Sequence, residues 1–354
     1  MTRKFGWFVV LAAFIVAPAA SRAEGGSADS IAKSRLHFDG KSGPGRGQHV
    51  VFVTGEEYYR SEEGMPMFAK ILSQRHGFDC TVLFAIDPES GIINPNRTHD
   101  IPGLDVLASA DLLVLFTRFR ELSDSDTKHI ADFINAGKPV IGFRNATHPF
   151  RYPADSSSAY ASWDFRSKKW PGGFGQQILG DTWVSHHGKF LKEATLAKVN
   201  SQHANHPVLR GVSPELFART DVNGVNKLTA SDTILYHGYV LPGMNRDDTP
   251  VADGRNDRPM PWAWFHDYTA PSGKSGRAFC LTAGASVDWL EEDLRRLVIN
   301  SVYSLTGLED QISARSNVDF VGAYEPSAFG SHTDDEWQKL NLRPGSFEIE
   351  APQR

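Results

Sequence analysis

Side chains able to do chemistry are concentrated in loops that follow apolar, strand-like segments of this chain. The clearest loop is residues 144–148, directly after the apolar segment 139–143. In open α/β sheets, ligands sit beyond the carboxyl ends of the strands, so we expect a site at this junction. The residues that we assign to it, from this loop and three others, are Glu56, Glu57, Tyr58, Arg60, Arg118, Arg120, Arg144, Thr147, His148, His186 and His187.

Proton transfer is the chemistry that four of these side chains suit best. A carboxylate at Glu56 or Glu57 is a candidate general base, and His148 or His187 is its candidate acid or base partner. An alternative for the two glutamates is a purely structural one, in which they complement the positive end of a helix. That alternative explains Glu56 less well, because it stands five positions before the expected helix start.

Four arginines accompany these groups in the same loops. Singly, each could be solvated or paired with a nearby acid, but together they favour a ligand that is anionic or rich in hydroxyl groups. Arg118, Arg120 and Arg144 would hold hydroxyls or polarise a carbonyl as negative charge develops on its oxygen. The remaining predicted substrate-binding residues are Tyr58, Arg60, Thr147 and His186.

Several signatures of other chemistries are missing from the sequence. It contains no GxSxG, GxCxG or P-loop motif and no GxGxxG motif after a strand, which disfavours serine hydrolases, thiol amidotransferases, NTPases and dinucleotide enzymes. No HExxH or comparable spacing predicts a metal site, so we expect no cofactor. A divalent metal bound by His148, His186 or His187 remains a less favoured alternative. Because His186 and His187 are adjacent, we expect no more than one of them to reach a given site.

The elements that position these loops follow from periodicity. Apolar segments at residues 49–54, 81–85, 112–116 and 139–143 predict buried strands, and Ser61, Ser123 and Ser286 are expected to cap helices. Further strands are predicted at residues 233–241, 261–268 and 277–282. Strands alternating with helices indicate an α/β fold with a mostly parallel sheet between helices. In such a sheet the loops after residues 54, 116 and 143 meet at one edge.

Domain organisation is predicted from composition. Residues 1–23 are typical of a secretory signal peptide, residues 24–48 of a linker, residues 49–309 of one domain with a long excursion, and residues 310–354 of a tail that wraps it. We therefore expect an exported protein, periplasmic or extracellular, with no membrane span after cleavage. The oligomeric state is left open, a homo-oligomer included.

Charge and cysteine content limit the partners. Loss of three positive side chains with the signal would take the formal net charge from −5 to −8, which disfavours nucleic-acid binding. Cys80 and Cys280 each lie in a strand-like segment, and their spacing does not require a disulfide, so two buried thiols are the favoured interpretation.

A set of short motifs resembles the ThuA-like (trehalose utilisation) family, closest to its exported bacterial branch. The resemblance covers roughly residues 49–309. The matching segments are the Val-Thr-Gly loop after the first strand, residues 136–142 leading into Ala-Thr-His, Gly172-Gly173-Phe174-Gly175, His186-His187-Gly188, His206-Pro207, Pro261-Trp262-Ala263-Trp264 and Gly276-Arg277-Ala278-Phe279.

The resemblance implies a class I glutamine amidotransferase-like fold, with a flavodoxin-like sheet. In amidotransferases of this fold the corner after the strand matching residues 139–143 carries a catalytic cysteine, and here Phe143-Arg144-Asn145 occupies it. Glutamine hydrolysis is therefore not expected. The family histidine near the first-strand loop is replaced by Tyr58-Tyr59-Arg60, a departure that bears on any shared mechanism. Members are associated with disaccharide metabolism and with oxidised keto-sugars.

The sequence thus predicts an exported enzyme that binds a sugar or keto-sugar derivative as its small-molecule ligand. An isomerase, a lyase or a hydrolase would each fit the residue set. The alternatives are a carbohydrate- or anion-binding module without catalysis and a metal-dependent hydrolase.

Overall fold

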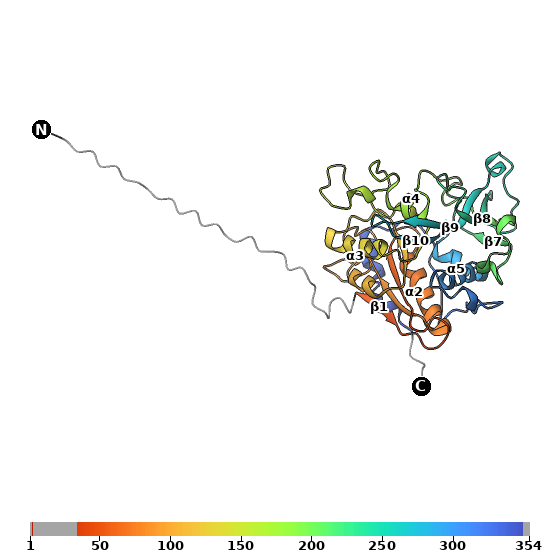
Figure 1. The fold of residues 1–354 in the computed structure, drawn as a ribbon, viewed down its shortest axis with the longest axis horizontal. Coiled ribbons are helices and arrows are strands. Elements are labelled where there is room, and N and C mark those ends of the chain that lie inside the picture. The colour runs from red at the N-terminus through yellow and green to blue at the C-terminus, as the bar shows by residue number, and fades with distance from the viewer. Residues whose placement is uncertain (1, 3–33, 350–354) are drawn as a thin grey trace.

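One ten-stranded sheet runs through the part of the chain that the computed structural model describes, which is residue 2 and residues 34–349 (Figure 1). The strand order is β1-β3-β2-β4-β5-β10-β9-β8-β6-β7. The predicted signal peptide and the start of the predicted linker lie outside the described residues, apart from residue 2. Within the described part, no helix is both long and apolar enough to cross a membrane.

The centre of the sheet is parallel, as the sequence predicts. Its strands are mainly apolar and, apart from the exposed start of β10, are largely buried on both faces, which is typical of parallel strands covered by helices. In spatial order they are β3 (Asp79–Leu83), β2 (His49–Gly55), β4 (Leu112–Thr117), β5 (Val140–Phe143) and β10 (Ser275–Leu281). Their parallel pairing places the carboxyl ends of β2, β4, β5 and β10 along one edge.

The rest of the sheet is antiparallel, so the prediction of a mostly parallel sheet holds only for its centre. Beyond β10 follow β9 (Met260–Thr269), β8 (Thr233–Val240), β6 (Thr195–Val199) and β7 (Glu215–Ala218). A tight turn joins β9 to β10, where Ala270 N donates to Lys274 O at 2.8 Å. Strands joined by so short a turn can only pair antiparallel, because a parallel crossover needs a dozen or more residues.

Part of the predicted linker is a strand. β1 (Arg35–Phe38) pairs antiparallel with the outer edge of β3, and Leu36 and Phe38 are buried in the core. Order therefore begins before His49, contrary to the sequence-based expectation. The physical reason is the unpaired edge of β3, which β1 covers with backbone hydrogen bonds and two apolar side chains.

Helices cover both faces of the sheet. Alternate residues of β2 divide between two apolar clusters, with Val50 and Phe52 in one and Val51 and Val53 in the other. The first cluster includes core residues of α2 (Ser61–Ile71) and α5 (Glu292–Leu305), and the second those of α3 (Asp124–Asn135) and α4 (Gly173–Leu179). Cys80 and Cys280 are free and buried, one in each cluster, as predicted.

The helix starts agree only in part with the predicted caps. Ser123 accepts a hydrogen bond from Asp126 N and caps α3, as predicted. Ser61 does not cap α2, because Arg60 occupies the cap position in the left-handed conformation (φ 60°) and Ser61 Oγ instead accepts from Gly55 N and Glu56 N. Ser286 begins a separate 3₁₀ turn, and α5 starts at Glu292.

The C-terminal tail packs against the domain. It contains the short helix α6 (Asp334–Leu340) and is described as far as residue 349. Gly330 N donates to Tyr58 O at 2.7 Å, and the rings of Phe329 and Tyr59 lie 5.5 Å apart. Trp337 of α6 is fully buried beneath the Arg60 guanidinium. The tail therefore packs directly behind the loop that follows β2.

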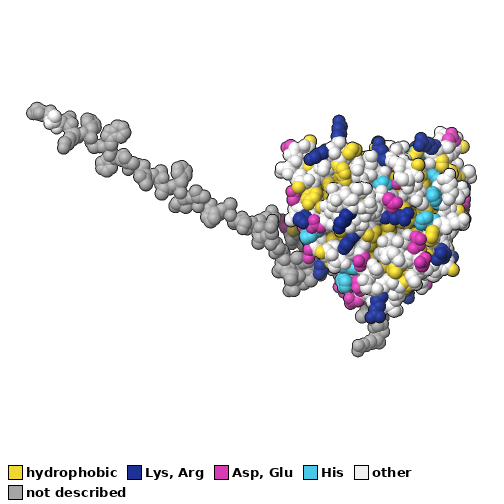
Figure 2. Space-filling view, in the orientation of Figure 1, with side chains coloured by type: hydrophobic (Ala, Val, Ile, Leu, Met, Phe, Trp, Pro, Cys, Tyr) yellow, Lys and Arg dark blue, Asp and Glu magenta, His cyan; other side chains and the backbone are white. Residues whose placement is uncertain are grey.

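Charges on the described surface are mixed. On the face that Figure 2 shows, Lys and Arg side chains are interspersed with Asp, Glu and His rather than gathered in one basic area.

We predict that Phe38→Ala will lower the free energy of unfolding by roughly 3 kcal/mol, because it removes a buried aromatic ring from the core. Asp39→Ala, one residue further along at an exposed position, is the matched control and should unfold like the wild type. Urea unfolding of the wild type and the two variants measures the free energy of unfolding of each. Equal stability of Phe38→Ala and the control would show that β1 does not pack onto the domain in solution.

Candidate functional site

The loops after β2, β4 and β5 meet at the carboxyl edge of the sheet. Arg118 N donates to Gly55 O at 3.2 Å, and Asn145 Nδ2 donates to Glu56 Oε1 at 2.7 Å. The convergence follows from the register, which aligns Gly55 with Thr117 on the neighbouring strand. Residues far apart in the chain thus share one edge, as expected of a parallel sheet.

Arg144 occupies the strand-to-helix corner after β5, and it is fully buried. Its backbone is in the left-handed region (φ 45°), a conformation that costs free energy for a residue with a side chain. The guanidinium donates to Asp221 Oδ1 and Asp221 O, both at 2.5 Å, to Thr282 O at 2.9 Å and to Tyr59 Oη at 3.0 Å.

These contacts give Arg144 a positioning role. Burial opposes its charge, but Asp221, Tyr59 and Asp288 together outweigh burial and raise the pKa of the guanidinium, so the side chain stays protonated. Because the side chain has no exposed surface, it cannot contact a ligand directly in this conformation. Its effect is to fix the Asp221 carboxylate at the edge of the sheet.

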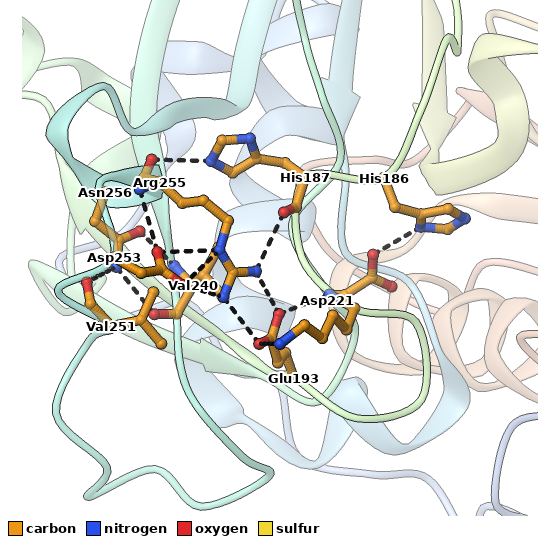
Figure 3. A network of polar contacts seen from close by, with 10 residues as sticks. His186, His187, Glu193, Asp221, Val240, Val251, Asp253, Arg255 and Asn256 are labelled. Carbon is orange, nitrogen blue, oxygen red and sulfur yellow. Dashed lines mark hydrogen bonds and ion pairs between the residues drawn. The ribbon is translucent and has the colours of Figure 1, made fainter.

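Asp221 also holds His186. Its second oxygen, Oδ2, accepts a hydrogen bond from His186 Nδ1 at 2.7 Å, and 35% of the His186 side chain is exposed (Figure 3). An imidazole that donates from Nδ1 to a carboxylate presents Nε2 as a hydrogen-bond acceptor. The pair therefore has the orientation required of a general base.

His187 points the other way. Its Nε2 lies 2.9 Å from the carbonyl oxygen of Arg255, in a separate network with Glu193 and Asp253 (Figure 3). The two rings lie in different networks, in agreement with the prediction that no more than one of them reaches a given site. His186, predicted to bind substrate, is the one that contacts Asp221, whereas His187 was the predicted catalytic residue.

Glu57 and Arg118 form an ion pair on the exposed side of the site. Both Nη2 and Nε of Arg118 contact Glu57 Oε1, at 2.7 and 2.8 Å, and the side chains are 21% and 15% exposed. Glu57 Oε2 is buried, accepts no hydrogen bond from any residue that the structure describes, and lies 3.9 Å from Nη2 of Arg120. The exposed part of the pair is therefore carried mainly by Arg118, which Glu57 holds in place.

Arg120 stabilises the loop after β4 through hydrogen bonds to backbone carbonyls. Its guanidinium donates to the carbonyl oxygens of Arg118, Arg97 and Pro95, and the side chain is buried. These three bonds use the guanidinium to brace two loops against each other. Arg120 therefore stands outside the exposed part of the site, contrary to its predicted substrate-binding role.

Glu56 is fully buried and heavily hydrogen-bonded. Its Oε2 accepts from Tyr58 N at 2.9 Å and Tyr59 N at 2.5 Å, while Asn145 holds Oε1. Burial, and next the charge of Glu57, raises the pKa of Glu56 to about 7, although the two backbone N–H groups act in the opposite direction. Near neutral pH the group exists in both protonation states.

Aromatic rings connect these groups into a closed circuit. Arg118 lies 4.5 Å from the ring centroids of both Tyr58 and Phe119. From Phe119 the circuit continues by ring contacts of 5.2 to 5.8 Å and returns to Tyr58. Its members, in order, are Phe119, His148, Trp183, His186, Phe190 and Tyr58.

His148 is the buried member of this circuit. Burial, and then the positive charges of Arg118 and Arg144, holds its pKa well below 6.5, so the imidazole is neutral near pH 7. Thr147 Oγ1 lies 3.3 Å from His148 Nδ1 and also donates to the Arg144 carbonyl. Thr147 therefore orients this ring and is itself buried.

Arg60 lies apart from the other predicted residues. It follows Tyr59 in the same turn, but its Nη2 donates to Gly330 O of the tail, and its guanidinium lies over the Trp337 ring.

Two residues of the site were not predicted from the sequence. They are Asp221, which holds His186, and Asn145, which holds Glu56. Neither residue belongs to a motif of recognisable spacing, and only the corner position of Asn145 pointed to it.

Among the described residues, no group of three or more His, Cys, Asp or Glu side chains is arranged to hold a metal ion.

Comparison with known proteins found similar solved structures of low sequence identity. Solved structures similar to this chain include a protein described as ThuA-like from Bacteroides uniformis, with 10% identity, 75% of this chain and 93% of that chain covered, and a TM-score of 0.43. A second, from Parabacteroides merdae, shows 14% identity, coverage of 80% and 97%, and the same TM-score. No family model and no curated protein matches. At these TM-scores the likeness says nothing of activity.

We predict that Asp221→Asn will lower the free energy of unfolding by about 3–5 kcal/mol, because it leaves the buried Arg144 charge without its counterion. Asp132→Asn, which breaks the exposed pair with Lys128, is the control and should leave stability close to that of the wild type. Denaturant unfolding at neutral pH compares them. Similar stabilities of the two variants would contradict the central position of the Arg144–Asp221 pair.

A second prediction concerns pH. The pKa of Glu56 is about 7 in the folded state against 4.5 ordinarily, so folding favours the protonated form and stability should fall as pH rises from about 4.5 to 7. Glu56→Gln removes this contribution, and the variant should lose less stability than the wild type over that interval. Unfolding measured at both pH values tests it. Parallel curves for the two proteins would show that Glu56 is ionised throughout.

Proposed function

We propose that this chain is an exported carbohydrate-active enzyme, an isomerase, lyase or hydrolase that acts on a sugar or keto-sugar derivative. The observation that carries the proposal is the His186–Asp221 pair, which lies in an aromatic circuit beside the Glu57–Arg118 ion pair. Proton transfer, hydroxyl binding and ring stacking are the three functions that a sugar enzyme needs.

His186 moves the proton in this proposal. With Nδ1 donating to Asp221, its Nε2 accepts a proton from a substrate hydroxyl or from carbon beside a carbonyl, and can return it later in the reaction. The Asp221 carboxylate stabilises the imidazolium that forms, as in other acid–histidine pairs. Arg144 keeps the carboxylate in place without touching the substrate.

Arg118 binds the substrate's oxygens, and Glu57 orients it. The partly exposed Arg118 guanidinium donates to a sugar hydroxyl and stabilises negative charge that develops on a carbonyl oxygen, while its bonds to Glu57 Oε1 fix its position. Tyr58, Phe119 and Trp183 offer partly exposed rings against which the apolar face of a sugar can pack. His148, buried and neutral, contributes its ring to the same wall.

Glutamine amidotransferase activity is not part of the proposal. Arg144 stands where a nucleophilic cysteine would be needed, and burial raises the pKa values of the Cys80 and Cys280 thiols well above their usual range. The order β3-β2-β4-β5-β10 supports a flavodoxin-like sheet, since it is second, first, third, fourth and fifth in chain order. We therefore propose a class I glutamine amidotransferase-like fold adapted to other chemistry.

The proposal is tested by screening native and oxidised disaccharides for protection against thermal unfolding, followed by turnover of those that protect. A ligand that binds the folded state raises the unfolding midpoint by mass action. Protection by sugars and not by matched polyols or amino acids supports a carbohydrate site. A panel without any shift would count decisively against it.

We predict that His186→Gln will reduce turnover of the protecting sugar at least 100-fold, since the proton acceptor is lost. His187→Gln is the matched control, because its ring contacts the Arg255 carbonyl and not Asp221. Single-turnover rates of both variants test whether His186 transfers the proton. Sugar binding with no turnover even in the wild type would identify a binding module, and equal rates in both variants would remove His186 from the reaction.

A further inference from the structure

A cavity lies between helix α2 and the C-terminal tail, and Arg60 of the turn after β2 is part of its lining. Its volume is about 240 Å³. This is below the roughly 300–1,000 Å³ of drug-sized ligand sites, so it suits a ligand of about one ring. The apolar residues that line it include Met67, Phe320, Val321, Tyr324, Leu342 and Phe347.

Two buried charged side chains, Glu62 and Arg60, line the same cavity, together with the more exposed Glu63, Lys70, Glu325 and His332. Arg60 Nη1 lies 3.8 Å from Glu62 Oε1, too far for a hydrogen bond. Among the described residues, neither Glu62 oxygen has a hydrogen-bond partner, and neither do Nε and Nη1 of Arg60. Native proteins rarely bury polar groups in this way, because an unsatisfied buried group destabilises the fold.

The buried Arg60–Glu62 pair selects for a neutral ligand. Arg60 disfavours a cation beside Glu62, and Glu62 disfavours an anion beside Arg60. A group that offers an N–H to Glu62 and a carbonyl oxygen to Arg60 satisfies both side chains at once.

We propose that this cavity binds a small neutral compound that combines one apolar ring with a carboxamide or lactam edge. The amide edge would face Glu62 and Arg60, and the ring would lie among Met67, Phe320 and Tyr324. The site is separate from the candidate active site: Tyr59 hydrogen-bonds Arg144, whereas the neighbouring Arg60 contacts the tail. The inference does not depend on the proposed sugar chemistry.

Four compounds with the same ring test the proposal on the full chain. Benzamide carries the amide edge, while benzoate, benzylamine and toluene offer an anion, a cation and no polar group. At roughly 10 mM, benzamide should raise the thermal unfolding midpoint by about 2 °C or more, and the other three should not. No shift with benzamide, or equal shifts with all four, would overturn the proposal.

Variants locate the binding. Glu62→Leu should abolish the benzamide shift, and Glu62→Gln should retain it because the side-chain amide still pairs with an amide edge. Glu63→Gln is the control, since the Glu63 carboxylate at the cavity accepts from Ser327 N. A benzamide shift unchanged in Glu62→Leu would place the compound elsewhere.

A measurement on the wild-type chain guards against a Glu62 variant that fails to fold. The ε-methyl group of Met67 belongs to the cavity lining, and the sequence contains only five methionines, so its NMR signal can be assigned. Benzamide should move the Met67 signal in proportion to occupancy, and toluene should not. If benzamide leaves that signal in place, the cavity is not its site.

Discussion

The buried ion pair of Arg144 and Asp221 is the interaction on which the arrangement at the sheet edge depends. A charge without exposed surface is tolerated only when its hydrogen bonds are largely satisfied, and Arg144 meets this condition through Asp221, Thr282 and Tyr59. Those three partners come from three different segments. One side chain in a strained left-handed corner therefore fixes the loops after β2 and β10 and the Asp221 loop relative to one another.

The orientation of His186 follows from that pair. Because Arg144 uses one oxygen of Asp221, the other is left to accept from His186 Nδ1, so Nε2 takes no part in the contact with Asp221. Arg144 itself has no exposed surface, and it acts on His186 only through Asp221.

The sequence was sufficient to predict the central strands and the meeting of three loops, because periodic apolar segments determine both. It assigned the catalytic role to His187, because strand alternation shows only that the side chains of His186 and His187 diverge. Asp221 was missed because nothing local marks a residue whose partners are distant in the chain. Residues 35–38 were predicted as part of a linker, because a strand of four residues at a sheet edge leaves little pattern. Arg120 and Arg60 were predicted to bind substrate because of their residue type, but both donate to backbone carbonyls and lie near the carboxylates of Glu57 and Glu62.

The packing of the tail against the turn after β2 has a consequence for biosynthesis. Phe329 and Gly330 contact Tyr59 and Tyr58, and Trp337 supports Arg60, yet these partners are separated by most of the polypeptide. A chain that emerges from the ribosome with its amino end first exposes the turn long before its supports exist. The nascent protein must therefore lack the finished turn after β2 until translation is nearly complete.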